Sequence, residues 1–247
     1  MPTHTDPTTP WIRRIVAAPD SAVRLVCFPH AGGSASYFRG LALALAPHVE
    51  TLAVQYPGRQ ERRREAPLES VTELADAAFE ALKDVADEPF AFFGHSLGAV
   101  VAFETALRFE GRPGGPVRLF ASAGCAPSVA RRPRLHLGDD DTLVAELSRL
   151  GGTDPAALAL PQARAQFLPA LRADYRAVGM YTVAPGARLT CPITVFLGDG
   201  DPIVSARDAV AWDDHTTKGT DTRTFEGGHF YLDGKAAEVA AEIIAAL

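Results

Sequence analysis

Apolar residues follow two different patterns that alternate along this chain. Short runs rich in β-branched and aromatic residues have the length of strands, whereas segments with apolar residues three or four positions apart have the period of helices. The runs typical of strands are Val23–Phe28, Thr51–Tyr56, Phe90–Phe93, Val117–Ala121, Ile193–Leu197 and Asp221–Phe225. The segments typical of helices are Tyr37–Ala46, Val71–Val85, Leu97–Phe109, one from about Ser205 and one from about Asp233 to Leu247. This alternation predicts an α/β fold, with a mostly parallel sheet flanked by helices.

One connection in this pattern is much longer than the others. It covers about seventy residues, between the strand ending near Ala123 and the strand starting near Pro192, where a crossover needs only about a dozen. Two amphipathic helical patterns lie inside it, one from Leu143 to Leu150 and one from Phe167 to Val178. Two prolines mark possible helix starts, in Asp154-Pro155 and Leu160-Pro161.

An insertion at this place lies above the carboxyl ends of the strands, where ligands bind in open α/β sheets. We therefore predict that residues 126–190, approximately, form a helical lid whose apolar faces line a substrate chamber. The alternative is an extra helical layer that only packs against the core.

Length and composition favour one soluble domain. A chain of 247 residues can bury one large core, so we predict a single domain over residues 1–247. A flexible tail is expected over about residues 1–10, which are polar and hold three prolines. No apolar run approaches the roughly 20 residues that span a bilayer, and the net charge of −6 argues against nucleic-acid binding. We expect a cytoplasmic monomer with no membrane partner.

The sequence Gly94-His95-Ser96-Leu97-Gly98 carries the clearest chemical signal. It follows a strand-like run and precedes a helical one, which is the setting of a nucleophile elbow. A serine hydroxyl becomes a useful nucleophile when such a turn exposes it to a neighbouring base. We therefore predict Ser96 as the nucleophile; the alternative is an ordinary glycine-rich turn.

The partners of such a serine follow it in the chain as an acid and then a histidine. His229 follows two glycines on a loop after a predicted strand, and its ordinary pKa near 6.5 suits proton transfer at neutral pH. Asp201 and Asp199 both follow the strand Ile193–Leu197. We favour Asp201, and Asp199 remains the alternative; Asp201 would otherwise be only a helix N-cap.

The oxyanion formed when the serine attacks needs hydrogen-bond donors already aimed at it. The backbone N–H of Leu97, directly after the nucleophile, is one candidate. The other is expected on the loop after an early strand, and the Gly32-Gly33 pair lets that loop approach the elbow. Ala31 is our candidate for the second backbone donor.

Other reactive residues have simpler interpretations. His95 and His30 are placed to support the site, and His215 is expected to be exposed at a helix end. The basic segment Arg59 and Arg62–Arg64 is interpreted as a solvated loop or as a contact for an acidic partner or a phosphate. The cysteines lack metal-ligand spacing and are expected to be buried thiols in a reducing cytoplasm; they are Cys27, Cys125 and Cys191.

Four segments together resemble the type II thioesterases that accompany modular polyketide synthases and nonribosomal peptide synthetases. These segments are Phe28-Pro29-His30-Ala31-Gly32-Gly33, Tyr56-Pro57-Gly58-Arg59, Gly94-His95-Ser96-Leu97-Gly98 and Gly227-Gly228-His229-Phe230. The resemblance extends from about Val23 to Leu247. It implies an α/β-hydrolase fold with a helical lid.

The resemblance also implies a substrate and a role. The substrate is an acyl group held as a thioester on the phosphopantetheine arm of an acyl or peptidyl carrier domain, and the role is to remove stalled or misprimed acyl groups. The predicted triad of Ser96, His229 and Asp201 suits this hydrolysis and needs no metal or cofactor. A general carboxylesterase with the same triad is the alternative enzyme, and a carrier-binding protein with an inactive site is the alternative outside enzymes.

Overall fold

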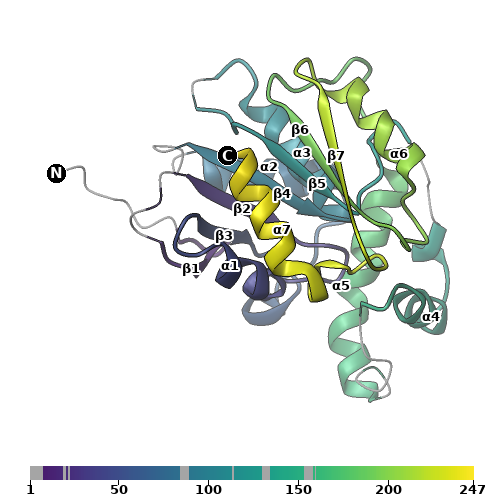
Figure 1. Ribbon diagram of the computed structural model, residues 1–247. Helices are drawn as coiled ribbons and strands as arrows, with labels where there is room; N and C mark the ends of the chain where they lie inside the picture. Colours follow the sequence, from purple (N-terminus) through teal and green to yellow (C-terminus); the bar gives the residue numbers. More distant parts are fainter. Residues whose placement is uncertain are drawn as a thin grey trace.

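A computed structural model describes residues 8–18, 21, 23–83, 89–112, 114–129, 134–152, 158 and 160–247. These residues form a seven-stranded sheet in the order β1-β3-β2-β4-β5-β6-β7. All neighbouring strands in it are parallel except β1 and β3, which confirms the predicted mostly parallel sheet (Figure 1). The strands are β1 (Ile12–Val16), β2 (Arg24–Phe28), β3 (Glu50–Val54), β4 (Phe90–His95), β5 (Leu119–Ser122), β6 (Ile193–Gly198) and β7 (Thr220–Phe225).

Seven α-helices and several single turns of 3-10 helix connect the strands within the described residues. The α-helices are α1 (Arg39–Leu45), α2 (Val71–Leu82), α3 (Leu97–Phe109), α4 (Asp140–Leu150), α5 (Pro161–Met180), α6 (Ala206–Val210) and α7 (Leu232–Ala246). The 3-10 turns are η1 (Ala35–Phe38), η2 (Gln60–Arg62), η3 (Arg134–Leu137) and η5 (Ala211–His215). Polar caps begin several of the helices; the Ser205 side chain, for example, accepts the backbone N–H of Asp208 at the start of α6.

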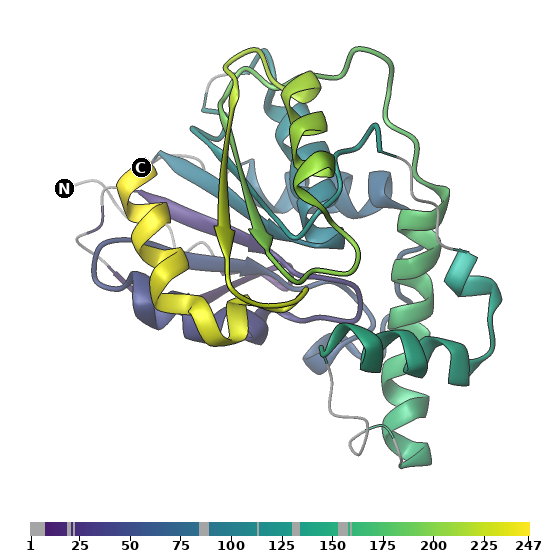
Figure 2. The same cartoon turned by 45° about the vertical axis from the view of Figure 1, so that its right-hand side comes forward.

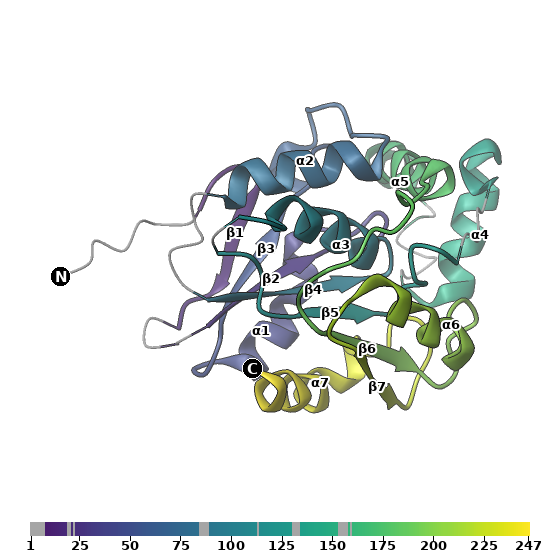
Figure 3. The same cartoon turned by 90° about the horizontal axis from the view of Figure 1, so that it is seen from above.

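Helices cover both faces of the sheet, as Figure 3 shows with α2 and α3 on one side and α1 and α7 on the other. The side chains of each central strand alternate between these layers. In β4, Phe90 and Phe92 pack toward α2 and α3, whereas Ala91 and Phe93 pack toward α1 and α7. Burial on both faces explains why the central strands are continuous apolar runs.

The strand β1 was not predicted. Arg13 and Arg14 interrupt its apolar pattern, and it pairs antiparallel with β3 at the edge of the sheet. Only one of its five residues, Ile12, is fully buried. An edge strand buries fewer side chains than a central one, so its sequence shows a weaker pattern.

The long connection between β5 and β6 carries η3, α4 and α5. Figure 2 shows α4 crossing α5 beside the ends toward which the strand arrows point. The two helices share a small apolar core, which includes Leu143 and Leu147 of α4 and Leu168 and Leu171 of α5. The start predicted at Leu160-Pro161 is confirmed, because α5 begins at Pro161. The start predicted at Asp154-Pro155 lies outside the described residues, as do residues 1–7 of the predicted tail and Val85.

The opposite edge of the sheet is formed by β7, in which residues 221–224 are exposed. In the part of the chain that the structure describes, no helix is long and apolar enough to cross a membrane. The prediction of three buried cysteines is wrong for Cys125, which lies half-buried in the loop after β5, while Cys27 and Cys191 are buried. Burial raises the pKa of the Cys27 thiol well above its ordinary value.

Candidate active site

Ser96 lies at the sharp turn between β4 and α3, with φ of +56° and ψ of −118°. Few residues with a side chain adopt this conformation, and strained backbone of this kind gathers at active sites. The turn brings the start of α3 so close to β2 that a Cβ on Gly98 would overlap the carbonyl oxygen of Phe28. Glycine at position 98 therefore permits the close strand-to-helix packing that exposes the Ser96 hydroxyl.

Three side chains far apart in sequence meet at this turn. The Nε2 atom of His229 lies 2.9 Å from Ser96 Oγ, and its Nδ1 atom lies 2.9 Å from Asp201 Oδ2. A carboxylate only accepts hydrogen bonds, so Nδ1–H donates to Asp201, and Nε2 is left to accept the serine hydroxyl. The side chains of His229 and Asp201 are 2% and 0% exposed. This geometry matches that of a nucleophile, a base and an orienting acid.

The two candidate acids have different partners. Asp201 contacts His229 and also accepts the backbone N–H groups of Ile203 and Val204 through Oδ1, at 2.8 and 3.3 Å. Asp199 instead accepts the backbone N–H of Gly227, on the loop that carries His229, at 2.9 Å. Asp201 is therefore the acid placed against the histidine, and Asp199 holds the histidine loop to the end of β6.

The two candidate oxyanion donors lie at the same pocket as the nucleophile. Ala31 and Leu97 both line the pocket that contains Ser96. Leu97 is the first residue of α3, where a backbone N–H has no acceptor within the helix. Ala31 occupies a tight turn closed by the bond from Gly33 N–H to the His30 carbonyl, at 2.9 Å.

A buried chain of hydrogen bonds holds His95, the residue before Ser96 in the turn. His95 Nδ1 lies 2.9 Å from Ser122 Oγ, which lies 2.6 Å from the Tyr231 hydroxyl. Burial holds the pKa of His95 well below its ordinary value, so this ring stays neutral. The sequence placed His95 near the site but did not reveal Ser122 and Tyr231, because nothing local to either residue marks a partner in another strand or helix.

His30 also lies beside the site, within an aromatic cluster. Its ring is 4.4 Å from that of Tyr37 and 4.8 Å from that of Phe230, measured between centroids. Burial, together with the nearby His229 and Arg59, lowers the pKa of His30 to about 3. His30 is therefore uncharged at neutral pH, and it lines a neighbouring cleft that shares Ala31 with the Ser96 pocket.

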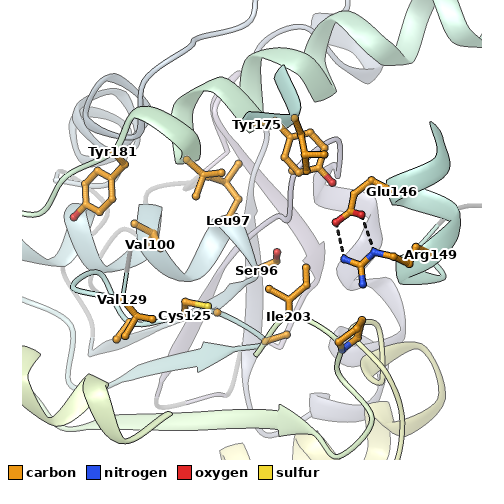
Figure 4. A pocket seen from close by; sticks show the side chains of 17 residues that line it. Ser96, Leu97, Val100, Cys125, Val129, Glu146, Arg149, Tyr175, Tyr181 and Ile203 are labelled. Atoms are coloured by element: carbon orange, nitrogen blue, oxygen red, sulfur yellow. Dashed lines mark hydrogen bonds and ion pairs between the residues drawn. The ribbon is translucent and has the colours of Figure 1, made fainter. Parts of the chain in front are cut away.

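A pocket of about 470 Å³ opens beside Ser96. Figure 4 shows its mainly apolar wall, to which Leu97 and Val100 of α3 and Tyr175 of α5 contribute. One ion pair interrupts this wall, between Glu146 and Arg149 of α4, at 2.7 Å. The size and lining of the pocket are typical of a site for a small apolar group. Among the described residues, no cluster of three His, Cys, Asp or Glu side chains is arranged to hold a metal ion.

The expected exposure of His215 is wrong, because its side chain is buried. Its ring packs 5.2 Å from that of Phe103, measured between centroids. Nδ1 lies 3.1 Å from the Ala187 carbonyl and Nε2 lies 2.9 Å from Ser128 Oγ. The η5 turn directs the ring inward, where it finds polar partners from two distant loops.

The interpretation of the basic segment as a solvated loop is wrong for two of its four arginines. Arg59 forms an ion pair with Asp174 of α5, and Arg62 lies over the Trp11 ring, 4.4 Å from its centroid. Both side chains are less than 10% exposed, whereas Arg63 and Arg64 are exposed. Long arginine stems pack on apolar surface while the guanidinium groups find specific partners.

Comparison with known proteins extends these observations to the whole chain. The family model described as "Thioesterase domain" matches residues 23–247. The chain is 48% identical over 235 residues to thioesterase PikA5 of Streptomyces venezuelae, covering 94% of this chain and 84% of that protein. It is 45% identical over 245 residues to a probable cadicidin biosynthesis thioesterase of Streptomyces griseus, covering 99% of this chain and 68% of that protein.

A solved structure is similarly close. The type II thioesterase BorB from the borrelidin biosynthetic cluster superimposes with a TM-score of 0.89 at 45% identity, covering 98% of each chain. This agreement supports the fold at the level of whole elements.

Proposed function

Since this chain belongs to the thioesterase family, we propose that it hydrolyses acyl thioesters held on the phosphopantetheine arm of acyl or peptidyl carrier domains. One relative is named a probable cadicidin biosynthesis thioesterase, and BorB is a type II thioesterase from the borrelidin biosynthetic cluster. In this role the enzyme clears stalled or misprimed acyl groups. The observation that carries the proposal is the bond of His229 to both Ser96 and Asp201, beside a largely apolar pocket.

The reaction begins with attack of Ser96 Oγ on the thioester carbonyl carbon. His229 Nε2 takes the hydroxyl proton, and Asp201 keeps the imidazole oriented and stabilises its positive charge. The carbonyl oxygen becomes an oxyanion, for which the N–H groups of Ala31 and Leu97 are the donors. Each such donor contributes about 3 kcal/mol to the stability of the transition state.

Collapse of this intermediate breaks the bond from carbon to sulfur. The thiol receives the proton from His229, and its pKa near 8.5 makes it a better leaving group than an alcohol. The acyl group then remains as an ester of Ser96. Water, deprotonated by the same histidine, attacks this ester and releases the acid and the serine hydroxyl.

Helices α4 and α5 act in this proposal as the lid of the acyl chamber. Val178 and Tyr175 of α5 and the Glu146–Arg149 pair of α4 line the pocket on the side away from the sheet. Their own apolar core lets the two helices move together as one unit. The position of this unit sets the length of acyl chain that the chamber accepts.

A comparison of matched esters tests the reaction. The wild-type enzyme is expected to hydrolyse acyl-pantetheine thioesters faster than oxygen esters of the same acyl group. The Ser96→Ala variant is expected to lose activity by a factor of about 10⁴ or more, as seen when triad nucleophiles are removed. A preference for oxygen esters would identify a carboxylesterase instead, and full activity in Ser96→Ala would remove Ser96 from the mechanism.

A further inference from the structure

We propose that Asp174, on helix α5, is a positioning residue that holds the turn carrying Ala31 in the conformation that binds the oxyanion. The oxyanion site is then complete only while α5 is seated against this turn. The inference rests on the proposed thioester hydrolysis, and it assigns Asp174 no contact with the reacting atoms.

One carboxylate oxygen of Asp174 joins three segments of the chain. Asp174 Oδ2 accepts the backbone N–H of Gly32 at 2.7 Å, and it also accepts the Arg59 guanidinium. Arg59 in turn donates to the Pro57 carbonyl at 2.7 Å. The donors lie 142 and 115 residues before Asp174 in sequence, so α5 contacts both the turn and the loop after β3.

The turn that contains Gly32 is of a kind for which two geometries exist in proteins. Gly33 N–H closes it onto the His30 carbonyl, and Gly32 has φ of +75°. This value is typical of the third position of a type II turn, which differs from type I by a flip of the central peptide. Asp174 holds the N–H of that central peptide, between Ala31 and Gly32. Loss of the acceptor frees this peptide to rotate, which changes ψ of Ala31 and removes the constraint that holds the neighbouring Ala31 N–H in place.

The α5 helix also packs against the turn directly. A Cβ on Gly32 would lie 2.7 Å from the ring of Phe167 and 3.2 Å from Leu171, both on α5. The turn and the helix are therefore in close contact over the two helical turns that precede Asp174. A shift of α5 away from the sheet removes this packing and the hydrogen bond together.

The burial of Asp174 favours a role beyond stability. Its side chain is 0% exposed, and Oδ1 has no hydrogen-bond partner in the described part of the chain. Burial raises the pKa of this carboxyl above its ordinary value, although Arg59 opposes the effect. Apolar residues of similar size often stabilise a fold as well as a buried ion pair does. A carboxylate here is explained by the N–H group that it orients.

The test compares the transition state with the ground state. Ser96 Oγ attacks the carbonyl of an acyl trifluoromethyl ketone, and the tetrahedral adduct places an oxyanion in the site. An acyl-pantetheine amide binds without reacting and so reports the ground state. In Asp174→Ala we expect kcat to fall about tenfold to a hundredfold, the scale of a small misplacement of a reacting group. Trifluoromethyl ketone affinity should fall by the same factor, while KM and amide affinity stay within about twofold.

Two further variants separate positioning from folding. Asp174→Asn keeps an oxygen acceptor for Gly32 N–H, so it is expected to restore most of kcat. The double variant Asp174→Leu with Arg59→Met replaces the whole ion pair by apolar groups, which protects the fold, and it is expected to show the same loss of kcat as Asp174→Ala. It serves as the test if Asp174→Ala does not fold.

Glu50→Ala is the matched control, because Glu50 is a similarly buried carboxylate that pairs with Arg24 at 2.8 Å, at the other end of the strands. It is expected to lower stability and leave the ratio of the two affinities unchanged. Equal losses of ketone and amide affinity in the Asp174 variants, or an unchanged kcat, would overturn the inference while wild-type thioesterase activity stands. A wild-type enzyme inactive on thioesters would overturn the proposed function itself.

Discussion

Ser96 combines a reactive side chain with a strained backbone. Its N–H donates to the Ser122 carbonyl at 2.8 Å, and its carbonyl accepts the N–H of Ala99 at 3.0 Å. These bonds fix the turn from both sides. Strain of this kind costs about 1–3 kcal/mol, and the buried sheet and α3 supply the stability that offsets it.

Replacement of Ser96 by glycine should therefore separate stability from activity. Glycine adopts positive φ without a steric penalty, so Ser96→Gly is expected to raise the free energy of unfolding by about 1 kcal/mol while abolishing hydrolysis. Urea denaturation at neutral pH measures the change. Ser96→Ala keeps a Cβ at the same φ and serves as the control; equal stability of the two variants would contradict the argument.

His30 predicts how stability depends on pH. Its pKa is about 3 in the folded protein, lowered from an ordinary value near 6.5 chiefly by burial. Between these values the unfolded chain binds a proton that the folded protein excludes, so stability falls as pH falls through this window. Within this window His30 is expected to change the free energy of unfolding by about 1.4 kcal/mol per pH unit.

Urea denaturation of the wild type and of His30→Gln at pH 7, 6 and 5 measures this contribution. The free energy of unfolding is expected to fall less steeply with falling pH in the variant than in the wild type. The difference in slope corresponds to close to one proton bound on unfolding. Parallel curves for the two proteins would mean that His30 is accessible to protons in the fold.

At the scale of elements, α4 and α5 share an apolar cluster distinct from the two clusters of the sheet, although Ala177 of α5 belongs to one of those two. The sheet has one apolar cluster on each face, and α4 and α5 share a third that lies mainly between them. Loss of a contact inside the third cluster is therefore expected to loosen α4 before it loosens the sheet. Segments of low local stability are those that move in catalysis.

Leu143→Ala tests this separation. Leu143 is 0% exposed within the α4–α5 cluster, and loss of a buried leucine costs about 2–5 kcal/mol. Hydrogen exchange in α4 is expected to accelerate about a hundredfold or more while the amides of β4 stay protected. Leu25→Ala is the control, because Leu25 is buried in the sheet. This variant is expected to accelerate hydrogen exchange in β4, which Leu143→Ala leaves protected.

The features of the fold and of the site that the sequence predicted are those marked by short local motifs or by a local apolar pattern. The elbow around Ser96 and the loop of His229 are short motifs beside strands with a strong apolar pattern, and the structure places both as expected. The burial of Arg59 and the contact of Asp174 with Gly32 depend on partners more than a hundred residues away. No periodicity or motif near Asp174 marks that contact. An aspartate in an amphipathic helical pattern is normally expected to face solvent.

At the scale of the whole molecule, net charge and local charge differ. The chain has a formal net charge of −6, yet Arg63 and Arg64 remain exposed after the burial of Arg59 and Arg62. Arg63 also lines a cleft with Ser34 and Tyr37, and this cleft shares Ala31 with the Ser96 pocket. Under the proposed function the substrate arrives on a carrier domain, which is typically acidic, so these two arginines are the part of the basic segment expected to attract it.

Charge reversal tests this attraction. Arg63→Glu with Arg64→Glu is expected to lower kcat/KM for an acyl group on a carrier domain about tenfold, with no change for free acyl-pantetheine. Added salt should reduce the wild-type rate on the carrier substrate only, because it screens exposed charges. Arg223→Glu, exposed on β7, is the control; an equal effect there would assign the change to net charge.

The exposed strand β7 has a consequence for how these molecules meet one another. An edge strand carries a row of backbone groups able to bond to a second chain, and such rows are starting points for aggregation. Along β7 the side chains beside this row belong to Asp221, Thr222, Arg223 and Thr224, all exposed. A strand arriving from a neighbouring molecule would have to dehydrate these charges. Growth of the sheet from one molecule into the next is therefore disfavoured.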